Sequence, residues 1–168
     1  MKYTRILATL LGALSLVMSG CGSGDKIANV SMTVNGTTGV VNLVGLGGTL
    51  PLAVHANYTS GKWIDETNYA KFTVTAMGVD FNTGLALSAS PATLAVSSTG
   101  LITATDPAVC TWDNLGTSTA PGWAYVGWYE ITATYRGFTS EPVYIPVASA
   151  ASSQTGMGGQ CGPVSTGN

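Results

Sequence analysis

Hydrophobic and polar residues alternate with a period of two along most of the chain after residue 27. The clearest stretches carry an apolar or aromatic side chain at every second position: 30–34, 50–58, 70–74, 129–135 and 143–147. Successive side chains of a β-strand point to opposite faces of a sheet, so each stretch predicts a strand with one buried face. Shorter apolar pieces at 40–46, 85–87, 94–96 and 101–104 predict further strands. No window of a dozen residues shows helical periodicity with caps, and we predict an all-β fold.

Turn signals divide these stretches into short strands. Asn35-Gly36 follows the first stretch and is a strong hairpin signal, and residues 59–62 predict a second turn. Short strands at this spacing are typical of a two-sheet sandwich. Pro142 and Pro146 are four residues apart, so their nitrogens face the same lateral side of a strand and offer it no hydrogen. We therefore expect the strand over 143–147 to lie at a sheet edge.

The first twenty residues have the features of a targeting segment. Lys2 and Arg5 precede an uncharged apolar run over residues 6–18, which is typical of a secretory signal peptide. As a helix this run would reach about 20 Å, at ~1.5 Å per residue. The hydrocarbon core of a bilayer is roughly 30 Å thick, so a permanent span is disfavoured.

Residues 18–21, Met-Ser-Gly-Cys, resemble the lipobox of bacterial lipoproteins, with Met18 in place of the usual Leu, Val or Ile. The resemblance implies removal of a signal peptide over 1–20 and lipidation of Cys21, which begins a short tether over 21–26. A plain signal peptide followed by an incidental cysteine is the alternative. Gly22 stands where the family's inner-membrane retention signal has Asp. We expect a protein held by lipid in the bacterial cell envelope, at the outer membrane, on its periplasmic or surface face.

The chain contains three cysteines. With Cys21 assigned to lipid, Cys110 and Cys161 remain. Two spare cysteines in an exported protein most often pair, so we predict a disulfide between them.

Four segments carry a second resemblance, and they occur in this order along the chain: Tyr58-Thr59-Ser60-Gly61, then 65–73 (DETNYAKFT), 93–104 (TLAVSSTGLITA) and 129–135 (YEITATY). Residues 27–148 are similar to a bacterial immunoglobulin-like domain of group 2, which implies an immunoglobulin-like two-sheet sandwich. Phe72 stands where that family often has Trp, and residues 105–127 form an insertion. The Gly- and Ser-rich tail over 149–168 lies outside the pattern and is expected to be flexible.

Composition and charge exclude one class of partner. Only 8% of the residues are charged, the net charge is −2, and there are six Lys and Arg residues. A nucleic-acid binder needs a basic stripe, which six cations in this chain cannot form.

Candidate catalytic chemistry is sparse. His55 is the only histidine, it falls on the outward parity of its strand, and no Gly-x-Ser-x-Gly elbow accompanies it. Asp65 and Glu66 are adjacent and point to opposite faces of an extended segment, so we expect Asp65 to cap a local turn rather than to join a catalytic pair. We therefore expect no enzyme, no cofactor and no metal. Calcium binding through scattered carboxylates (Asp65, Glu66, Asp80, Asp106 and Asp113) is the alternative left open.

Aromatic residues gather between residues 112 and 129. On strand parity, Trp123, Tyr125 and Tyr129 share a face and Trp128 lies opposite. One interpretation places Tyr129 in the core and the others over a sheet edge or the disulfide loop. The other makes Trp112, Trp123, Tyr125 and Trp128 a ligand contact, because Trp and Tyr give large contact areas at low entropic cost. We expect a non-enzymatic protein for adhesion, scaffolding or protein–protein contact. A carbohydrate-binding module that uses these rings is the alternative.

Overall fold

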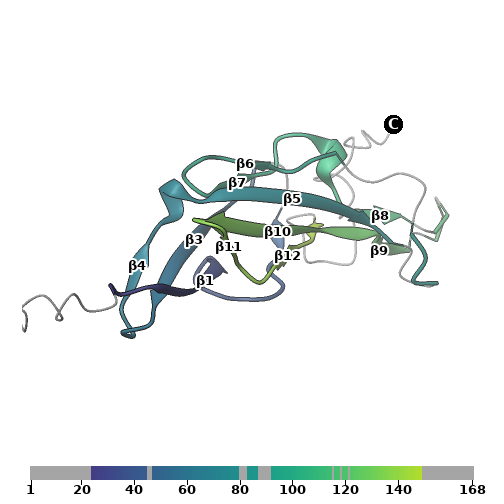
Figure 1. The fold of residues 1–168 in the computed structure, drawn as a ribbon. Coiled ribbons are helices and arrows are strands. Elements are labelled where there is room, and N and C mark those ends of the chain that lie inside the picture. The colour runs from purple at the N-terminus through teal and green to yellow at the C-terminus, as the bar shows by residue number, and fades with distance from the viewer. Residues whose placement is uncertain are drawn as a thin grey trace, which may run out of the picture.

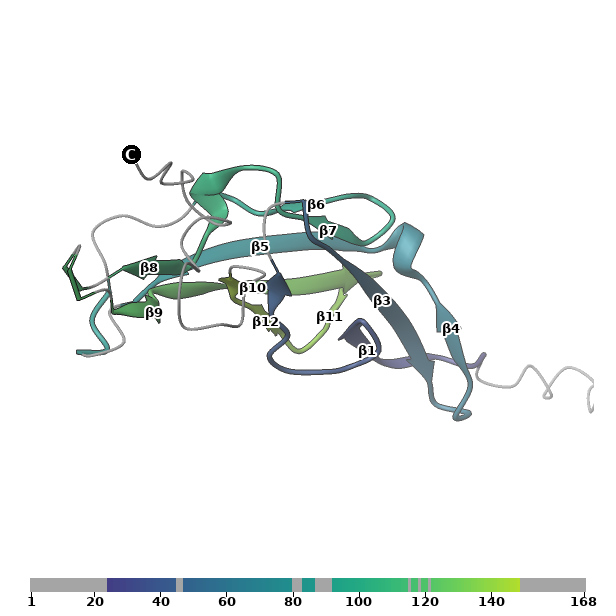
Figure 2. The ribbon, with the colours of Figure 1, turned by 180° about the vertical axis from the view of Figure 1, so that it is seen from behind.

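A computed structural model describes residues 24–44, 47–79, 83–86, 92–114, 116–117, 119–120 and 122–148, and it confirms the all-β prediction (Figures 1 and 2). Two antiparallel sheets face each other, and the helical elements in this part are two single 3₁₀ turns. The elements are β1 (Ile27–Val34), β2 (Leu43–Val44), β3 (Thr49–Tyr58), β4 (Trp63–Asp65), η2 (Thr67–Tyr69), β5 (Lys71–Gly78), β6 (Ala95–Val96), β7 (Leu101–Thr103), η3 (Pro107–Val109), β8 (Trp112–Asn114), β9 (Trp123–Tyr125), β10 (Gly127–Tyr135), β11 (Phe138–Thr139), β12 (Val143–Ile145) and β13 (Val147–Ala148). No helix within these ranges is long and apolar enough to cross a bilayer.

The first sheet is built around β3. Its strands lie in the order β1-β3-β7-β6, and β4 pairs with β3 on the same side as β7. The register places Val54 opposite Met32 and Ala56 opposite Val30, so the alternating apolar residues of β1 and β3 share one face. All four are buried, which confirms the alternation that predicted these strands.

The second sheet is built around β10. Strand β5 runs along one side of it, from Gly78 opposite Gly127 to Lys71 opposite Thr134, and β11 and β12 pair with the other side. The apolar residues at every second position of β10 are buried, and Tyr129 and Ile131 are fully buried. They meet the inner face of β1 and β3 in a single hydrophobic core.

The predicted turn after β1 forms, but the hairpin ends there. Asn35 and Gly36 both have positive φ (48° and 77°), as the favoured two-residue hairpin turn requires. Val34 and Thr37 exchange backbone hydrogen bonds of 2.7 and 2.9 Å. Beyond Thr37 the chain leaves the first sheet, because β1 takes β3 as its partner instead.

Strand β12 is an outer strand of the second sheet, as predicted, but its outer side is not without partners. Residues 39–44 run parallel to β12 and β13 on the side away from β10. Val41 donates its N–H to the carbonyl of Tyr144 at 3.0 Å, and Leu43 donates to the carbonyl of Pro146 at 2.9 Å. Both prolines do face this side. The lack of an N–H group on the prolines does not prevent this pairing. Its hydrogen bonds use the carbonyl of Pro146 and both the N–H and the carbonyl of Tyr144.

Tyr129 fastens the insertion over 105–127 to the core. Its hydroxyl oxygen lies 2.6 Å from the carbonyl of Ala92 and 2.9 Å from that of Val109 in η3. Burial, with the nearby charge of Asp106, raises the pKa of Tyr129. The interpretation of Tyr129 as a core residue is therefore confirmed.

Thr111 ties the same insertion to the last strand. Its side-chain oxygen accepts the N–H of Val147 at 2.7 Å, and its own N–H donates to the Val147 carbonyl at 3.1 Å. The Thr111 carbonyl accepts the N–H of Val126 at 2.7 Å. Thr111 is fully buried. The segment around Thr111 is thus part of the sandwich.

Candidate functional site

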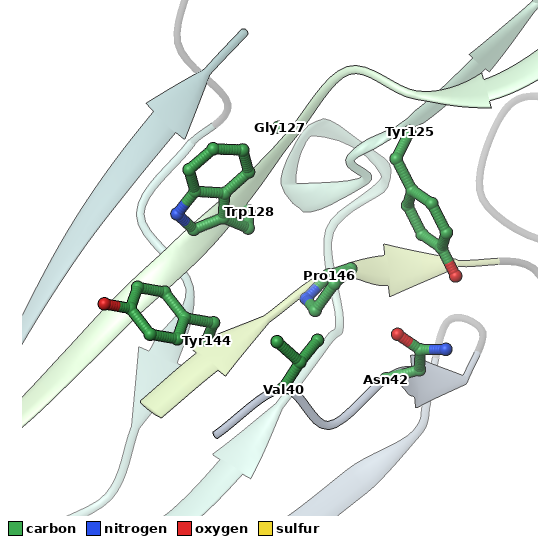
Figure 3. A pocket seen from close by; sticks show the side chains of 7 residues that line it. All are labelled: Val40, Asn42, Tyr125, Gly127, Trp128, Tyr144 and Pro146. Carbon is green, nitrogen blue, oxygen red and sulfur yellow. The ribbon is translucent and has the colours of Figure 1, made fainter. Parts of the chain in front are cut away.

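A hollow of about 380 Å³ opens beside the beginning of β10 (Figure 3). Its wall consists of Val40, Asn42, Tyr125, Gly127, Trp128, Tyr144 and Pro146. These residues come from three separate parts of the chain: the segment that runs along β12, the β9–β10 region, and β12 with its C-terminal flank. We call this set the aromatic hollow.

The strand break at Val126 explains why Tyr125 and Trp128 line the same space. Val126 lies between β9 and β10, where its N–H donates to Thr111 and its carbonyl accepts the N–H of Val79 at 2.9 Å. The alternation of faces does not continue through this point. Tyr125 and Trp128 therefore border the aromatic hollow together, while Tyr129 enters the core. The prediction that Trp128 lies opposite Tyr129 is confirmed, and the prediction that Tyr125 shares the face of Tyr129 is wrong.

Two aromatic side chains from neighbouring strands form one side of the hollow. Glu130 of β10 is directly opposite Tyr144 of β12. Trp128 is two residues before Glu130 on the same face of β10, so it is the diagonal neighbour of Tyr144 and within reach of its ring. The rings of Trp128 and Tyr144 border the opening, and Pro146 lies between these rings and Tyr125 (Figure 3). The Trp128 side chain is half-buried, and its indole nitrogen is 3.4 Å from a carboxylate oxygen of Glu130.

Polar groups occur on the opposite side of the aromatic hollow. The hydroxyl of Tyr125 and the carboxamide of Asn42 lie next to each other there (Figure 3). Partial burial raises the pKa of Tyr125, so its hydroxyl is protonated at neutral pH. The site therefore combines aromatic faces with neutral hydrogen-bonding groups.

Trp112 and Trp123, the other two predicted contact residues, lie on the adjacent β8–β9 hairpin. The backbone of Trp112 is opposite Tyr125, and that of Trp123 is opposite Asn114. Only these backbone positions are described, so a role for the two side chains stays a prediction.

Sequence reasoning missed five residues of the aromatic hollow: Val40, Asn42, Gly127, Tyr144 and Pro146. Tyr144 carried a usable signal, since an aromatic residue on the outward parity of an alternating strand is a candidate contact. Pro146 was interpreted only as an edge marker. Val40 and Asn42 carried no signal, because their position depends on pairing with a strand about a hundred residues later in the chain.

A second hollow, of about 310 Å³, is polar and has a structural explanation. Asp65 lies in its wall, where one carboxylate oxygen accepts the N–H of Thr67 at 2.9 Å and the Thr67 hydroxyl at 2.6 Å. The Thr67 hydroxyl oxygen in turn accepts the N–H of Val54 at 2.9 Å. These bonds confirm the prediction that Asp65 caps a turn. In the part of the chain that is described, no group of three or more His, Cys, Asp and Glu side chains could hold a metal ion.

The turn-capping carboxylates predict loss of stability in acid. Hydrogen bonds from Thr67 lower the pKa of Asp65 below its usual 3.8, and hydrogen bonds from Ser60 and Thr59 lower that of Asp25. A lowered folded-state pKa adds stability at pH values above the unfolded pKa, and the stability is lost as the pH falls through the folded value. We expect a melting temperature that is flat near neutral pH and falls below about pH 4.

Thermal unfolding followed by circular dichroism across this pH range checks the expectation. Asp65→Asn should show a shallower acid slope than the unsubstituted chain, because it removes one of the two carboxylates. Equal slopes in the two proteins would show that Asp65 does not contribute.

No protein-family model matches this chain, and no curated protein matches its sequence. The two resemblances noted in the sequence therefore depend on the quoted residues alone.

Proposed function

We propose that the protein is a non-enzymatic, lipid-anchored component of the bacterial cell envelope whose immunoglobulin-like sandwich contacts a partner protein through the aromatic hollow. The observation that carries the proposal is the wall of that hollow, where the rings of Tyr125, Trp128 and Tyr144 meet the apolar side chains of Val40 and Pro146. Trp and Tyr dominate binding hot spots because they bury a large area with few rotatable bonds. A partner with an exposed aromatic or apolar side chain suits this hollow.

The position of the aromatic hollow supports presentation to a partner. The hollow lies beside the beginning of β10, whereas the chain enters β1 at the opposite end of the sandwich (Figure 1). A lipid-anchored tether over residues 21–26 would attach this opposite end of the sandwich to the membrane. The hollow then points away from the membrane.

A disulfide between Cys110 and Cys161 is part of the proposal. Cys110 packs half-buried against the core. Its neighbour Thr111 is bonded to Val147, so the segment that leads to Cys161 starts beside Cys110. Cys21 and Cys161 both lie outside the described residues.

Matched tryptophan substitutions test the contact. The domain without its signal segment is immobilised, and envelope proteins that it retains are identified and titrated. We expect Trp128→Ala to weaken binding of such a partner by about tenfold or more, in the range of a hot-spot truncation. Trp63→Ala is the control, because Trp63 is 61% exposed and lies on β4, away from the aromatic hollow. The proposal would be contradicted if the unsubstituted domain, Trp128→Ala and Trp63→Ala all retained the partner protein equally well.

Carbohydrate binding is a second candidate, favoured by a hollow whose wall contains the Tyr125 side chain and the Asn42 carboxamide as well as the rings of Trp128 and Tyr144. Sugar rings stack their C–H faces on aromatic side chains, and neutral amide and hydroxyl groups bond their hydroxyls. A glycan array with the same two variants distinguishes the candidates. Carbohydrate binding is supported if the unsubstituted domain and Trp63→Ala bind a glycan that Trp128→Ala does not bind. It is opposed if the unsubstituted domain binds no glycan above background.

A further inference from the structure

The start of the described chain is fastened to the turn between β3 and β4. The Asp25 carboxylate accepts the Ser60 hydroxyl at 2.5 Å, the Ser60 N–H at 3.1 Å and the Thr59 hydroxyl at 3.1 Å. The N–H of Thr59 donates to the carbonyl of Lys26 at 2.9 Å. We call residues 24–26 together with residues 58–63 the tether end.

An exposed tryptophan lies at the tether end. Trp63, the first residue of β4, is 61% exposed, and its ring is held against the imidazole of His55 with 4.6 Å between the ring centroids. The contact explains why His55, on the outward side of β3 as predicted, is only half-exposed. The function proposed above does not use Trp63.

Two lysines accompany Trp63 at the tether end, and the carboxylate of Asp65, two residues further along β4, is hydrogen-bonded to Thr67. Lys26 and Lys62 belong to the tether end, and Asp25 is the only acidic residue within its two segments. The chain as a whole is acidic, with a net charge of −2. Tryptophan concentrates at the membrane–water interface, because its ring is apolar while its N–H prefers water and headgroups. Lysine extends its charge toward the headgroups while its stem stays against apolar surface.

The length of the connecting chain fixes how far the tether end can stand from a lipid at Cys21. Three residue steps separate Cys21 from Gly24, and an extended chain spans at most about 3.5 Å per step. An acylated Cys21 therefore keeps Gly24 within about 10 Å of the Cα atom that carries the lipid. The hydrogen bonds of Asp25 pass this restraint on to the β3–β4 turn.

We propose that the tether end rests on the phospholipid surface of the membrane that holds the anchor, with the Trp63 indole in the headgroup region. The proposal depends on the lipid anchor proposed above and adds a defined orientation to it. The β3–β4 turn then contacts the bilayer. The aromatic hollow, beside the beginning of β10, lies at the end of the sandwich opposite this turn (Figures 1 and 2).

Fluorescence quenching by brominated lipid tests this orientation in the lipidated chain. The chain is purified from the membrane fraction of a bacterial host, and acylation of Cys21 is checked by mass. It is then placed in vesicles of phosphatidylethanolamine and phosphatidylglycerol that contain phosphatidylcholine brominated near the headgroup. Three proteins are compared: the unsubstituted chain, Trp63→Phe and Trp128→Phe. Both substitutions are conservative, and neither replaces a fully buried side chain.

We expect brominated lipid to quench the unsubstituted chain and Trp128→Phe, and at least half of this quenching to disappear in Trp63→Phe. Equal quenching in Trp63→Phe, or none in the unsubstituted chain although Cys21 is acylated, would overturn the proposal and leave the lipid anchor standing. In that case Trp63 faces water or another partner. A chain without acyl groups would overturn the anchor itself, and the proposed orientation with it.

Discussion

Replacing Gly127 by alanine is expected to destabilise the domain by about 3 kcal/mol, the upper part of the usual range for overpacking. A Cβ atom added there would collide with the carbonyl oxygen of Met77 and lie 3.2 Å from the Cα of Gly78. Both atoms belong to β5, which pairs with β10 at this point, so relief requires the two strands to separate. Because Gly127 also lines the aromatic hollow, the same change should weaken ligand binding.

Chemical denaturation of Gly127→Ala and Gly122→Ala measures the effect against a matched control. A Cβ at Gly122 would meet its nearest atom, the backbone nitrogen of Gly116, at an ordinary 3.5 Å. We expect the control to change the free energy of unfolding by less than about 0.5 kcal/mol. Similar stabilities for the two variants would show that β5 and β10 are not paired closely at Gly127.

Truncation of Tyr129 is expected to have a still larger effect. Tyr129→Ala removes a fully buried ring from the centre of β10 and should cost about 4 kcal/mol, as for other large aromatic residues. Tyr129→Phe keeps the ring but leaves the carbonyls of Ala92 and Val109 without their donor. Loss of such buried hydrogen bonds costs about 1–3 kcal/mol.

Thermal and chemical unfolding of both variants measure these costs. Tyr144→Phe is the control for the hydroxyl, because within the described ranges the Tyr144 hydroxyl makes no protein hydrogen bond, and we expect a change below about 0.5 kcal/mol. For a domain of this size, a loss of 4 kcal/mol lowers the melting temperature by roughly 10 °C. If Tyr129→Phe were as stable as the unsubstituted chain, the insertion would not be held by this hydroxyl.

The period-two pattern predicted the strands well where one face is buried along the whole strand. In β1, β3 and β10 the buried positions are the alternating apolar positions of the sequence, including Val54 and Ile131. The sequence is sufficient here, because in a strand the burial of each residue depends only on which face of the strand meets the core. The same local logic predicted that Asp65 caps the turn before η2.

Features that depend on pairing between distant segments escaped prediction. The segment that contains Val40 is apolar, but nothing in its sequence says that it runs parallel to β12 and covers the side that Pro142 and Pro146 face. The break at Val126 was missed for a related reason. Its backbone bonds go to Thr111 and Val79, and only those tertiary bonds reveal that the alternation of faces stops there.

The candidate site was therefore predicted in part. Tyr125 and Trp128 were identified from residue type, because Trp and Tyr give large contact areas at low entropic cost. Val40 and Asn42 join the aromatic hollow only when residues 39–44 pair with β12 and β13.

Intact-mass spectrometry of the chain, extracted from bacterial membranes and kept unreduced, tests the central claim most directly. We predict a polypeptide that begins at Cys21, carries acyl chains on that residue, and yields no free thiol because Cys110 and Cys161 are joined. A chain recovered in the soluble fraction that still begins at Met1, with all its thiols open to alkylation, would contradict the account.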